Sequence, residues 1–125
     1  MSPRTSPATA HELQRIGLLA TLPGETLTRL AARMQREEVP AGRAVVSEGE
    51  QGDRFYVVFA GMLSVTSSAM GPREVLRPGD YFGEVAAAMG VPRTASVRAL
   101  TPTTVASCDR AAFDEFVRPL FSAEA

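Results

Sequence analysis

The sequence lacks the features of secreted, membrane-spanning and nucleic-acid-binding proteins. Its single cysteine, Cys108, cannot form a disulfide within the chain, as is usual in a reducing cytoplasm. No stretch approaches the roughly 20 apolar residues that a helix needs to cross a membrane. The formal net charge is -1, so the basic surplus with which proteins neutralise nucleic-acid phosphates is missing. We therefore expect a cytoplasmic protein with no nucleic-acid partner and no membrane segment in this chain.

The sequence is also poor in the side chains on which hydrolytic and metal-dependent catalysis relies. It has one histidine, His11, whereas metal-dependent β-roll enzymes need several histidine ligands. Neither a serine–histidine–aspartate group, nor a cysteine–histidine pair, nor paired carboxylates can be assembled convincingly from the remaining residues. We expect no catalysis and no metal site. We interpret Cys108 as a small buried hydrophobic residue and His11 as a solvated side chain.

Lysine is absent, since all 13 basic residues are arginine, and alanine is abundant, a usage typical of GC-rich bacterial genomes. Hydrophobic residues make up 45% of the chain and charged residues 22%, which is ordinary for a globular protein. A length of 125 residues fits one domain with one core. The N-terminal residues are rich in serine, proline, threonine and alanine and lack the apolar region of a signal peptide. We expect a flexible leader at 1–10 and a single domain at 11–125.

Apolar residues at helical spacing are followed by a series of short strands. Apolar residues recur every three to four positions within 11–19 and within 27–34, which predicts two helices. Short apolar runs follow, bounded by glycine or proline turns such as Gly71-Pro72, and they predict strands at 44–46, 55–59, 62–65, 75–76, 96–100 and 104–107.

Two further helices complete the expected fold. The alanine-rich segment 83–90 favours a short helix inside the strand series. A last helix is expected to start near Arg110, with Asp109 as its N-cap and Pro119 at its end. The sequence therefore predicts an α+β fold. It would consist of N-terminal helices, an antiparallel, jelly-roll-like β-roll that contains one short helix, and a C-terminal helix.

The segment Phe82–Val97, FGEVAAAMGVPRTASV, has the chemistry of an anion site. If Gly83 begins the short helix, unpaired backbone N–H groups and the helix dipole converge there, and the missing Cβ lets a ligand approach. Arg93 supplies a planar guanidinium that suits two phosphate oxygens at once. Glu84 would repel a lone anion, but its carboxylate can accept a hydrogen bond from a sugar hydroxyl. These residues are compatible with a sugar phosphate as ligand.

The same segment resembles the phosphate-binding cassette of the cyclic nucleotide-binding domain family. This family includes the regulatory subunits of cAMP-dependent protein kinase, cyclic nucleotide-gated channels and catabolite activator proteins. Its pattern is roughly F-G-E-[LIM]-[AG]-L, a short spacer, and P-R-[AST]-A-[ST]-V. Phe82-Gly83-Glu84 and Pro92–Val97 match both halves, at the spacing typical of the kinase subunits. The resemblance extends over about residues 13–120 and includes Gly52–Val58.

The resemblance implies a role for each candidate site residue. Glu84 would accept the ribose 2′-OH, and Arg93 would pair with the cyclic phosphate. Asp53 would steady that arginine, and Val65 would lie against the base. Backbone amides would complete the phosphate cradle around Gly83, Val85, Ala86, Thr94 and Ala95. The implied ligand is cAMP or cGMP, with cAMP favoured, and no other cofactor is implied. Thr94 does not decide the base, because members of both specificities have threonine there.

Two features depart from the family pattern. Ala87 and Ala88 stand where the cassette helix usually has a bulky aliphatic residue, so weaker packing could loosen the cassette. After Pro119 only 120–125 remain, whereas the family continues into a long helix that covers the base. The lid would come from elsewhere, or the domain belongs to a larger protein, or the ligand lies open.

The sequence thus predicts a non-catalytic regulatory sensor that acts on an effector domain or partner protein of unknown identity, in an oligomeric state left open. The alternative is a degenerate roll that serves as a protein-interaction or structural module. The intact set of Gly83, Glu84 and Arg93 argues against the alternative, since a purely structural roll does not require it.

Overall fold

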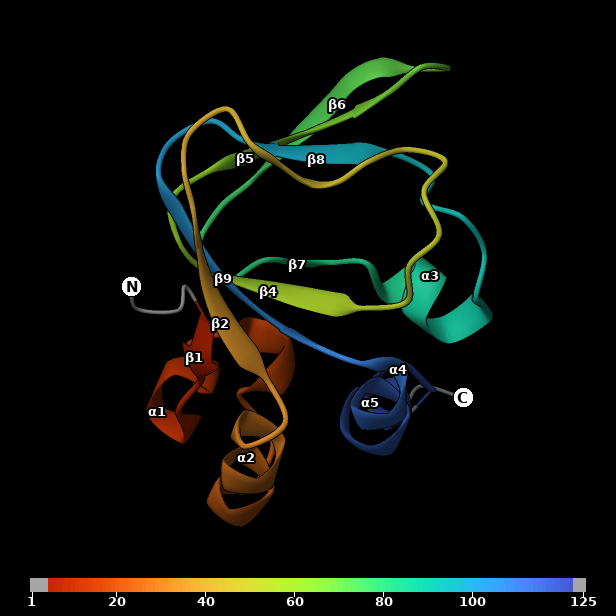
Figure 1. Cartoon of the computed structure of the whole chain (residues 1–125). Coiled ribbons are helices and arrows are strands. Elements are labelled where there is room, and N and C mark those ends of the chain that lie inside the picture. The colour runs from red at the N-terminus through yellow and green to blue at the C-terminus, as the bar shows by residue number, and fades with distance from the viewer. Residues whose placement is uncertain (1–4, 123–125) are drawn as a thin grey trace.

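Two antiparallel sheets face each other in the computed structural model, which describes residues 5–122 (Figure 1). The five-stranded sheet has the order β1 (Thr5–Pro7), β2 (Gln35–Val39), β9 (Thr103–Cys108), β4 (Phe55–Ala60) and β7 (Tyr81–Phe82). The four-stranded sheet has the order β3 (Ala44–Val46), β8 (Ser96–Ala99), β5 (Leu63–Ser67) and β6 (Gly71–Leu76). All neighbouring strands run antiparallel, so the predicted α+β fold with an antiparallel roll is confirmed.

Helical segments precede the roll, interrupt it and follow it, in the predicted order. The first are α1 (Ala10–Leu13), the 3₁₀ turn η1 (Gly17–Leu19) and α2 (Gly24–Ala31). The interrupting helix is α3 (Glu84–Met89). The last segment joins α4 (Arg110–Ala112), the π-helical turn η2 (Phe113–Val117) and α5 (Arg118–Ser122). In Figure 1 the N-terminal helices and this last segment lie on the side of the five-stranded sheet that faces away from the roll interior. No helix within 5–122 combines the length and apolar character needed to span a membrane.

The central strands β4 and β9 are buried on both faces of the five-stranded sheet, which explains why β4 reads as a nearly continuous apolar run. Val58 and Val105 pack inside the roll with residues of the other sheet. Phe55 and Val57 point the opposite way and pack against the helices. Their fully buried helical neighbours are Leu13, Ile16, Leu19, Leu30, Phe113 and Val117. The helices therefore share one hydrophobic core with the five-stranded sheet.

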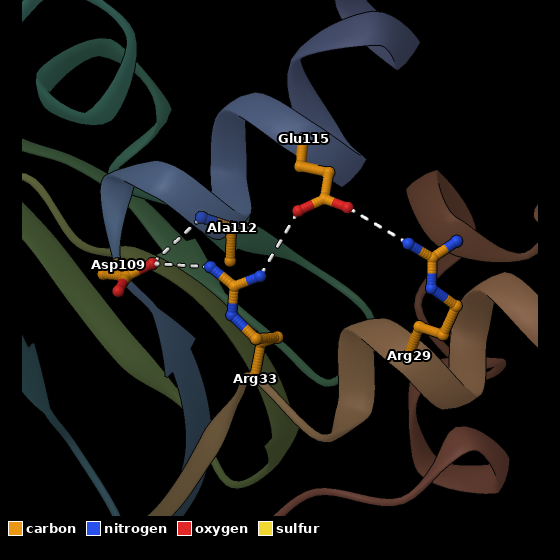
Figure 2. A network of polar contacts seen from close by, with 5 residues as sticks. All are labelled: Arg29, Arg33, Asp109, Ala112 and Glu115. Atoms are coloured by element: carbon orange, nitrogen blue, oxygen red, sulfur yellow. Dashed lines mark hydrogen bonds and ion pairs between the residues drawn. The ribbon is translucent and has the colours of Figure 1, made fainter.

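Charged side chains join the last helical segment to α2 (Figure 2). The carboxylate of Glu115 accepts hydrogen bonds from Arg29 Nη2 at 3.2 Å and from Arg33 Nη1 at 3.3 Å. Asp109 lies 3.7 Å from Arg33 Nη2. Asp109 also accepts a hydrogen bond of 2.9 Å from the backbone N–H of Ala112, so its predicted N-cap role is confirmed. These contacts hold two segments together that are far apart in the sequence.

The N-terminal part differs from the sequence prediction in two respects. Thr5–Pro7 form β1, Ala8 is buried and Thr9 caps α1, so only residues 1–4 of the predicted flexible leader lie outside the described residues. The single helix expected over 11–19 is divided into α1 and η1. Its buried residues are three positions apart, a spacing that suits 3₁₀ turns better than an α-helix.

Two proline positions also differ from the prediction. Gly71-Pro72 belong to β6 instead of a turn, and Pro72 pairs with Thr66 next to an irregularity in the register. Because β6 is an edge strand, the N–H group that proline lacks is dispensable there. Pro119 does not end the last helical segment but stands second in α5, directly after the π-helical turn η2.

Candidate functional site

A pocket with a cavity volume of about 350 Å³ lies between the four-stranded sheet and the segment that contains α3. Its lining includes all of the predicted site residues except Asp53: Val65, Gly83, Glu84, Val85, Ala86, Arg93, Thr94 and Ala95. The remaining lining residues are Val46, Glu74, Leu76, Tyr81, Phe82, Pro92 and Val97. The structure therefore brings the two halves of the sequence motif to one site, although Gly90 and the residues around it separate them in the chain.

Gly83 fills a position that no other residue fits without strain. It is the N-cap of α3 and has a φ of 90°, a left-handed conformation that favours glycine. A Cβ atom on Gly83 would lie 2.6 Å from the carbonyl oxygen of Arg54 and 3.1 Å from Arg93 Nη1. The glycine thus lets the start of α3 approach the guanidinium of Arg93. Backbone N–H groups in the first turn of a helix have no partner within the helix, so those of α3 can serve a ligand in the pocket.

Arg93 is buried, with 7% of its surface exposed, although its side chain is charged. Its backbone is fixed on both sides, because its N–H donates to the Glu50 carbonyl at 3.0 Å and its carbonyl accepts from Gly49 at 2.8 Å. The side chain donates from Nη2 to the Arg54 carbonyl at 3.2 Å. A guanidinium has five N–H donors, so this arrangement leaves donors for an anion in the pocket.

Asp53 does not occupy the position that the resemblance implied. Its side chain is exposed, it does not line the pocket, and no ion pair joins it to Arg93 within residues 5–122. The carbonyl of the next residue, Arg54, accepts the hydrogen bond from Arg93 instead. Arg54 is itself held by Ser107, which accepts from its Nε at 3.0 Å and from its Nη2 at 3.3 Å.

One wall of the pocket is a row of residues that are direct partners across four strands, and we call it the valine row. Val46 pairs with Val97, Val97 with Val65, and Val65 with Glu74. Directly paired residues of antiparallel strands point to the same face of a sheet, and all four line the pocket. The row consists of three valines and ends at the edge strand β6 in the exposed carboxylate of Glu74. The pocket is thus lined by charged side chains, those of Arg93, Glu84 and Glu74, and by an apolar row.

Sequence reasoning missed Glu74, because its place in the pocket follows from the register of β6 against β5. Because Gly71 and Pro72 read as a turn, the strand was predicted only at 75–76, and Glu74 was left outside it, whereas β6 extends over Gly71–Leu76. The sequence Glu74-Val75-Leu76 does not alternate between polar and apolar residues, so it does not show that Glu74 and Leu76 face the pocket.

Several other residues have the surroundings that the sequence suggested. Cys108 is fully buried, and burial raises the pKa of its thiol to about 12, which confirms its interpretation as a small hydrophobic residue. His11 is exposed. Tyr81 lines the pocket, where burial and then the charge of Glu84 raise the pKa of its phenol, so this ring remains neutral.

The end of α3 contacts the last helical segment. The carbonyl of Ala88 accepts hydrogen bonds from Arg118 Nη2 at 3.0 Å and from Arg110 Nη2 at 3.4 Å. Ala87 is fully buried against the core on the same side of α3. The helix that lines the pocket is therefore connected with α4 and α5 through a polar contact as well as through packing.

Known proteins match both the sequence and the fold. A sequence model of the family described as "Cyclic nucleotide-binding domain" matches residues 36–119. The cAMP-dependent protein kinase regulatory subunit of Eremothecium gossypii is 35% identical over 108 residues, which cover 86% of this chain and 24% of that protein. The CRP-like cAMP-activated global transcriptional regulator of Mycobacterium tuberculosis is 30% identical over 109 residues, 84% of this chain and 49% of the regulator.

A solved structure extends the likeness to three dimensions. The regulatory domain of Toxoplasma gondii PKA, crystallised with cAMP, has a TM-score of 0.84 and 28% identity, covering 92% of this chain and 46% of that one. The similar proteins come from fungi and an apicomplexan parasite as well as from a bacterium, so they do not support the bacterial origin that residue usage suggested. The chain spans only 24% of the length of the Eremothecium protein.

Proposed function

The chain belongs to the cyclic nucleotide-binding domain family, and we propose that it is a non-catalytic regulatory module that binds cAMP in preference to cGMP. The observation that carries this proposal is the pocket itself. A buried guanidinium, Arg93, lies beside a left-handed glycine, Gly83, and the same pocket is lined by an apolar row of valines and by the carboxylate of Glu74. A nucleotide has groups that match this lining: a phosphate, a sugar, an apolar ring and polar groups on the ring edge.

At the end of the pocket where Arg93 lies, its guanidinium would pair with the cyclic phosphate. The backbone amides of 83–86 and 94–95 would complete the phosphate cradle, because these residues line the same pocket. Glu84 would accept the hydrogen bond of the ribose 2′-OH. A 3′,5′-cyclic phosphate has one charge and fits within this end, whereas the linear phosphate of 5′-AMP has additional charge and extends farther from the sugar.

At the outer strand, Glu74 supports adenine over guanine where position 6 of the base faces it, since guanine has its own donors at N1 and on its 2-amino group instead. An ionised carboxylate can only accept hydrogen bonds. Adenine has an amino donor at position 6, whereas guanine has a carbonyl acceptor there. Val65 and Val97 would pack against the base and direct this edge toward Glu74. The regulators from Eremothecium and Mycobacterium are named for cAMP, which supports the same preference.

Calorimetric titrations with cAMP, cGMP and 5′-AMP test the proposal. We expect micromolar binding of cAMP, weaker binding of cGMP, and the weakest binding of 5′-AMP. Glu74→Gln should narrow the difference between cAMP and cGMP, because an amide can donate to the guanine carbonyl as well as accept. Exchanging the exposed Glu38, which lies on β2, for Gln is the matched control. Binding of 5′-AMP as tight as that of cAMP would refute the proposal, and no binding at millimolar nucleotide would favour a degenerate interaction module.

The regulatory output would pass through the last helical segment to an effector domain or partner protein. Movement of α3 toward a bound phosphate would pull on the Ala88 carbonyl, to which Arg110 and Arg118 donate. The hinge would lie near Asp109 and Arg110, where the strand ends. Hydrogen exchange with and without cAMP tests this route. Unchanged exchange rates over 111–119 would contradict it.

A further inference from the structure

The guanidinium of Arg93 lies in a narrow slot with an aromatic wall. Its central carbon lies 5.9 Å from the ring centroid of Tyr56, close enough for a cation–π interaction. A Cβ atom on Gly52 would lie 3.2 Å from Nη2, and one on Gly83 would lie 3.1 Å from Nη1. Two glycines and one aromatic ring therefore lie close to the guanidinium, the glycines near its two different terminal nitrogens.

The aromatic wall is itself held in place. The ring of Tyr56 stacks on that of Phe82 with a centroid distance of 4.7 Å and an angle of 0° between the ring planes. The two residues are direct partners in the pairing of β4 with β7, so the backbone fixes the stack. Phe82 also lines the pocket and directly precedes Gly83. The slot and the start of α3 are thus built on the same pair of strands.

The charges around Arg93 show why such a wall is needed. No carboxylate forms an ion pair with Arg93 in the part of the chain that the structure describes, and its side-chain hydrogen bond goes to a neutral carbonyl, that of Arg54. A desolvated cation without an opposite charge is stabilised by the face of an aromatic ring. Burial raises the pKa of the Tyr56 phenol, and the charges of Arg93 and Arg54 oppose this effect, so the ring is neutral at physiological pH.

We propose that Tyr56 is a positioning residue for the anion site, and that its stacked ring holds the Arg93 guanidinium in the orientation that receives the phosphate. This inference rests on the proposed function for the identity of the ligand. The ring would thus orient the Arg93 guanidinium, the role that the sequence had assigned to the carboxylate of Asp53. An aromatic wall holds the guanidinium without neutralising it, so its full charge remains available to the phosphate.

Substitutions at position 56 separate the ring from the hydroxyl group. Tyr56→Leu removes the ring face, and we expect binding of cAMP about 5- to 30-fold weaker, the loss of a desolvated cation–π contact. Tyr56→Phe keeps the ring and should restore most of the affinity. In an Arg93→Gln background, Tyr56→Leu should change the affinity by no more than about twofold, because the ring then has no cation to position. Equal losses in both backgrounds would overturn the proposal.

Gly52→Ala tests the slot independently of the aromatic ring, because only atoms of Arg93 are among the three nearest to the added Cβ. Its Cβ would press on Nη2, so we expect weaker cAMP binding, whereas Gly24→Ala, with no atom within 4 Å of the added Cβ, should bind as the parent does. Unchanged affinity of both Gly52→Ala and Tyr56→Leu would show that the slot does not position Arg93.

A measurement without ligand distinguishes failure of this inference from failure of the proposed function. In ¹⁵N-edited NMR spectra of the free protein, the Nε–H signal of Arg93 should be shifted by the ring and slow to exchange with water in the parent and in Tyr56→Phe. It should lose both properties in Tyr56→Leu. An unchanged signal in Tyr56→Leu would refute the positioning role even if the parent bound cAMP. A parent that binds neither cAMP nor cGMP would refute the proposed function, while this signal would still decide the role of Tyr56.

Discussion

Arg93→Ala removes the guanidinium from the pocket, and its expected effect can be worked out from the structure. Truncating one partner of a buried, hydrogen-bonded charge pair costs about 2–5 kcal/mol of binding free energy, or roughly 30-fold to several thousand-fold in affinity. At a cAMP concentration of about 100 times the parent Kd, the ligand adds about 2.7 kcal/mol to the stability of the parent. For the variant the same concentration adds about 0.9 kcal/mol or less.

The same substitution should leave the fold intact without ligand. It removes the hydrogen bond to the Arg54 carbonyl, worth about 0.5–1.5 kcal/mol, but it also removes a buried charge that no carboxylate neutralises. We therefore expect similar melting temperatures for the two ligand-free proteins and a much smaller shift with cAMP in the variant, measured by thermal scans and calorimetry. Arg98→Ala, which removes an exposed arginine on the adjacent strand β8, is the matched control. Parental affinity of Arg93→Ala for cAMP and cGMP would refute the placement of the phosphate.

Three further substitutions have distinct expected outcomes. Glu84→Ala should weaken cAMP binding by about 1.5–3 kcal/mol, the value of a hydrogen bond to a charged group, and calorimetry should show a narrower gap between cAMP and its 2′-deoxyribose analogue. Gly83→Ala should lower the melting temperature of the ligand-free protein, because its Cβ would lie 2.6 Å from a backbone oxygen at a φ of 90°; a melting temperature equal to that of Gly24→Ala would contradict this. Asp109→Ala should cost about 1 kcal/mol of unfolding free energy through loss of the N-cap, whereas Asp109→Asn should retain most of it in denaturant titrations.

The sequence predicted those helices and strands that can be recognised from the residues within and directly beside them. Strand β4 is apolar over nearly its whole length, β9 contains an apolar centre at Val105-Ala106, and α3 is bounded by glycines on both sides. The two halves of the motif around Gly83 and Arg93 could be assigned to one site because their residue types and their spacing match the family pattern, without knowledge of how they pack. The pocket then formed where this spacing predicted it.

The missed features depend on pairing between distant segments. Gln35–Val39 has no alternation of polar and apolar residues, and it becomes β2 because it pairs with β1 on one side and with β9 on the other. The same holds for Glu74, whose inward position is set by its partner Val65. Asp53 shows the opposite case. The hydrogen bond from Arg93 goes to the carbonyl of the next residue, Arg54, which directly precedes β4, and spacing alone does not fix whether a side chain or a carbonyl is the partner.

The burial of Arg93 connects the stability of the fold with the proposed binding of an anion. A guanidinium that is 7% exposed and unpaired with a carboxylate has already lost most of its hydration in the free protein. The fold bears that cost in advance, so an arriving phosphate meets a cation that it does not have to desolvate or orient. Two contacts stabilise the buried guanidinium, the hydrogen bond to the Arg54 carbonyl and the ring of Tyr56. Space for it exists because Gly52 and Gly83 have no Cβ. A chain with the same motif but without this slot would retain its arginine and lose the preorganisation that gives the arginine its affinity for phosphate.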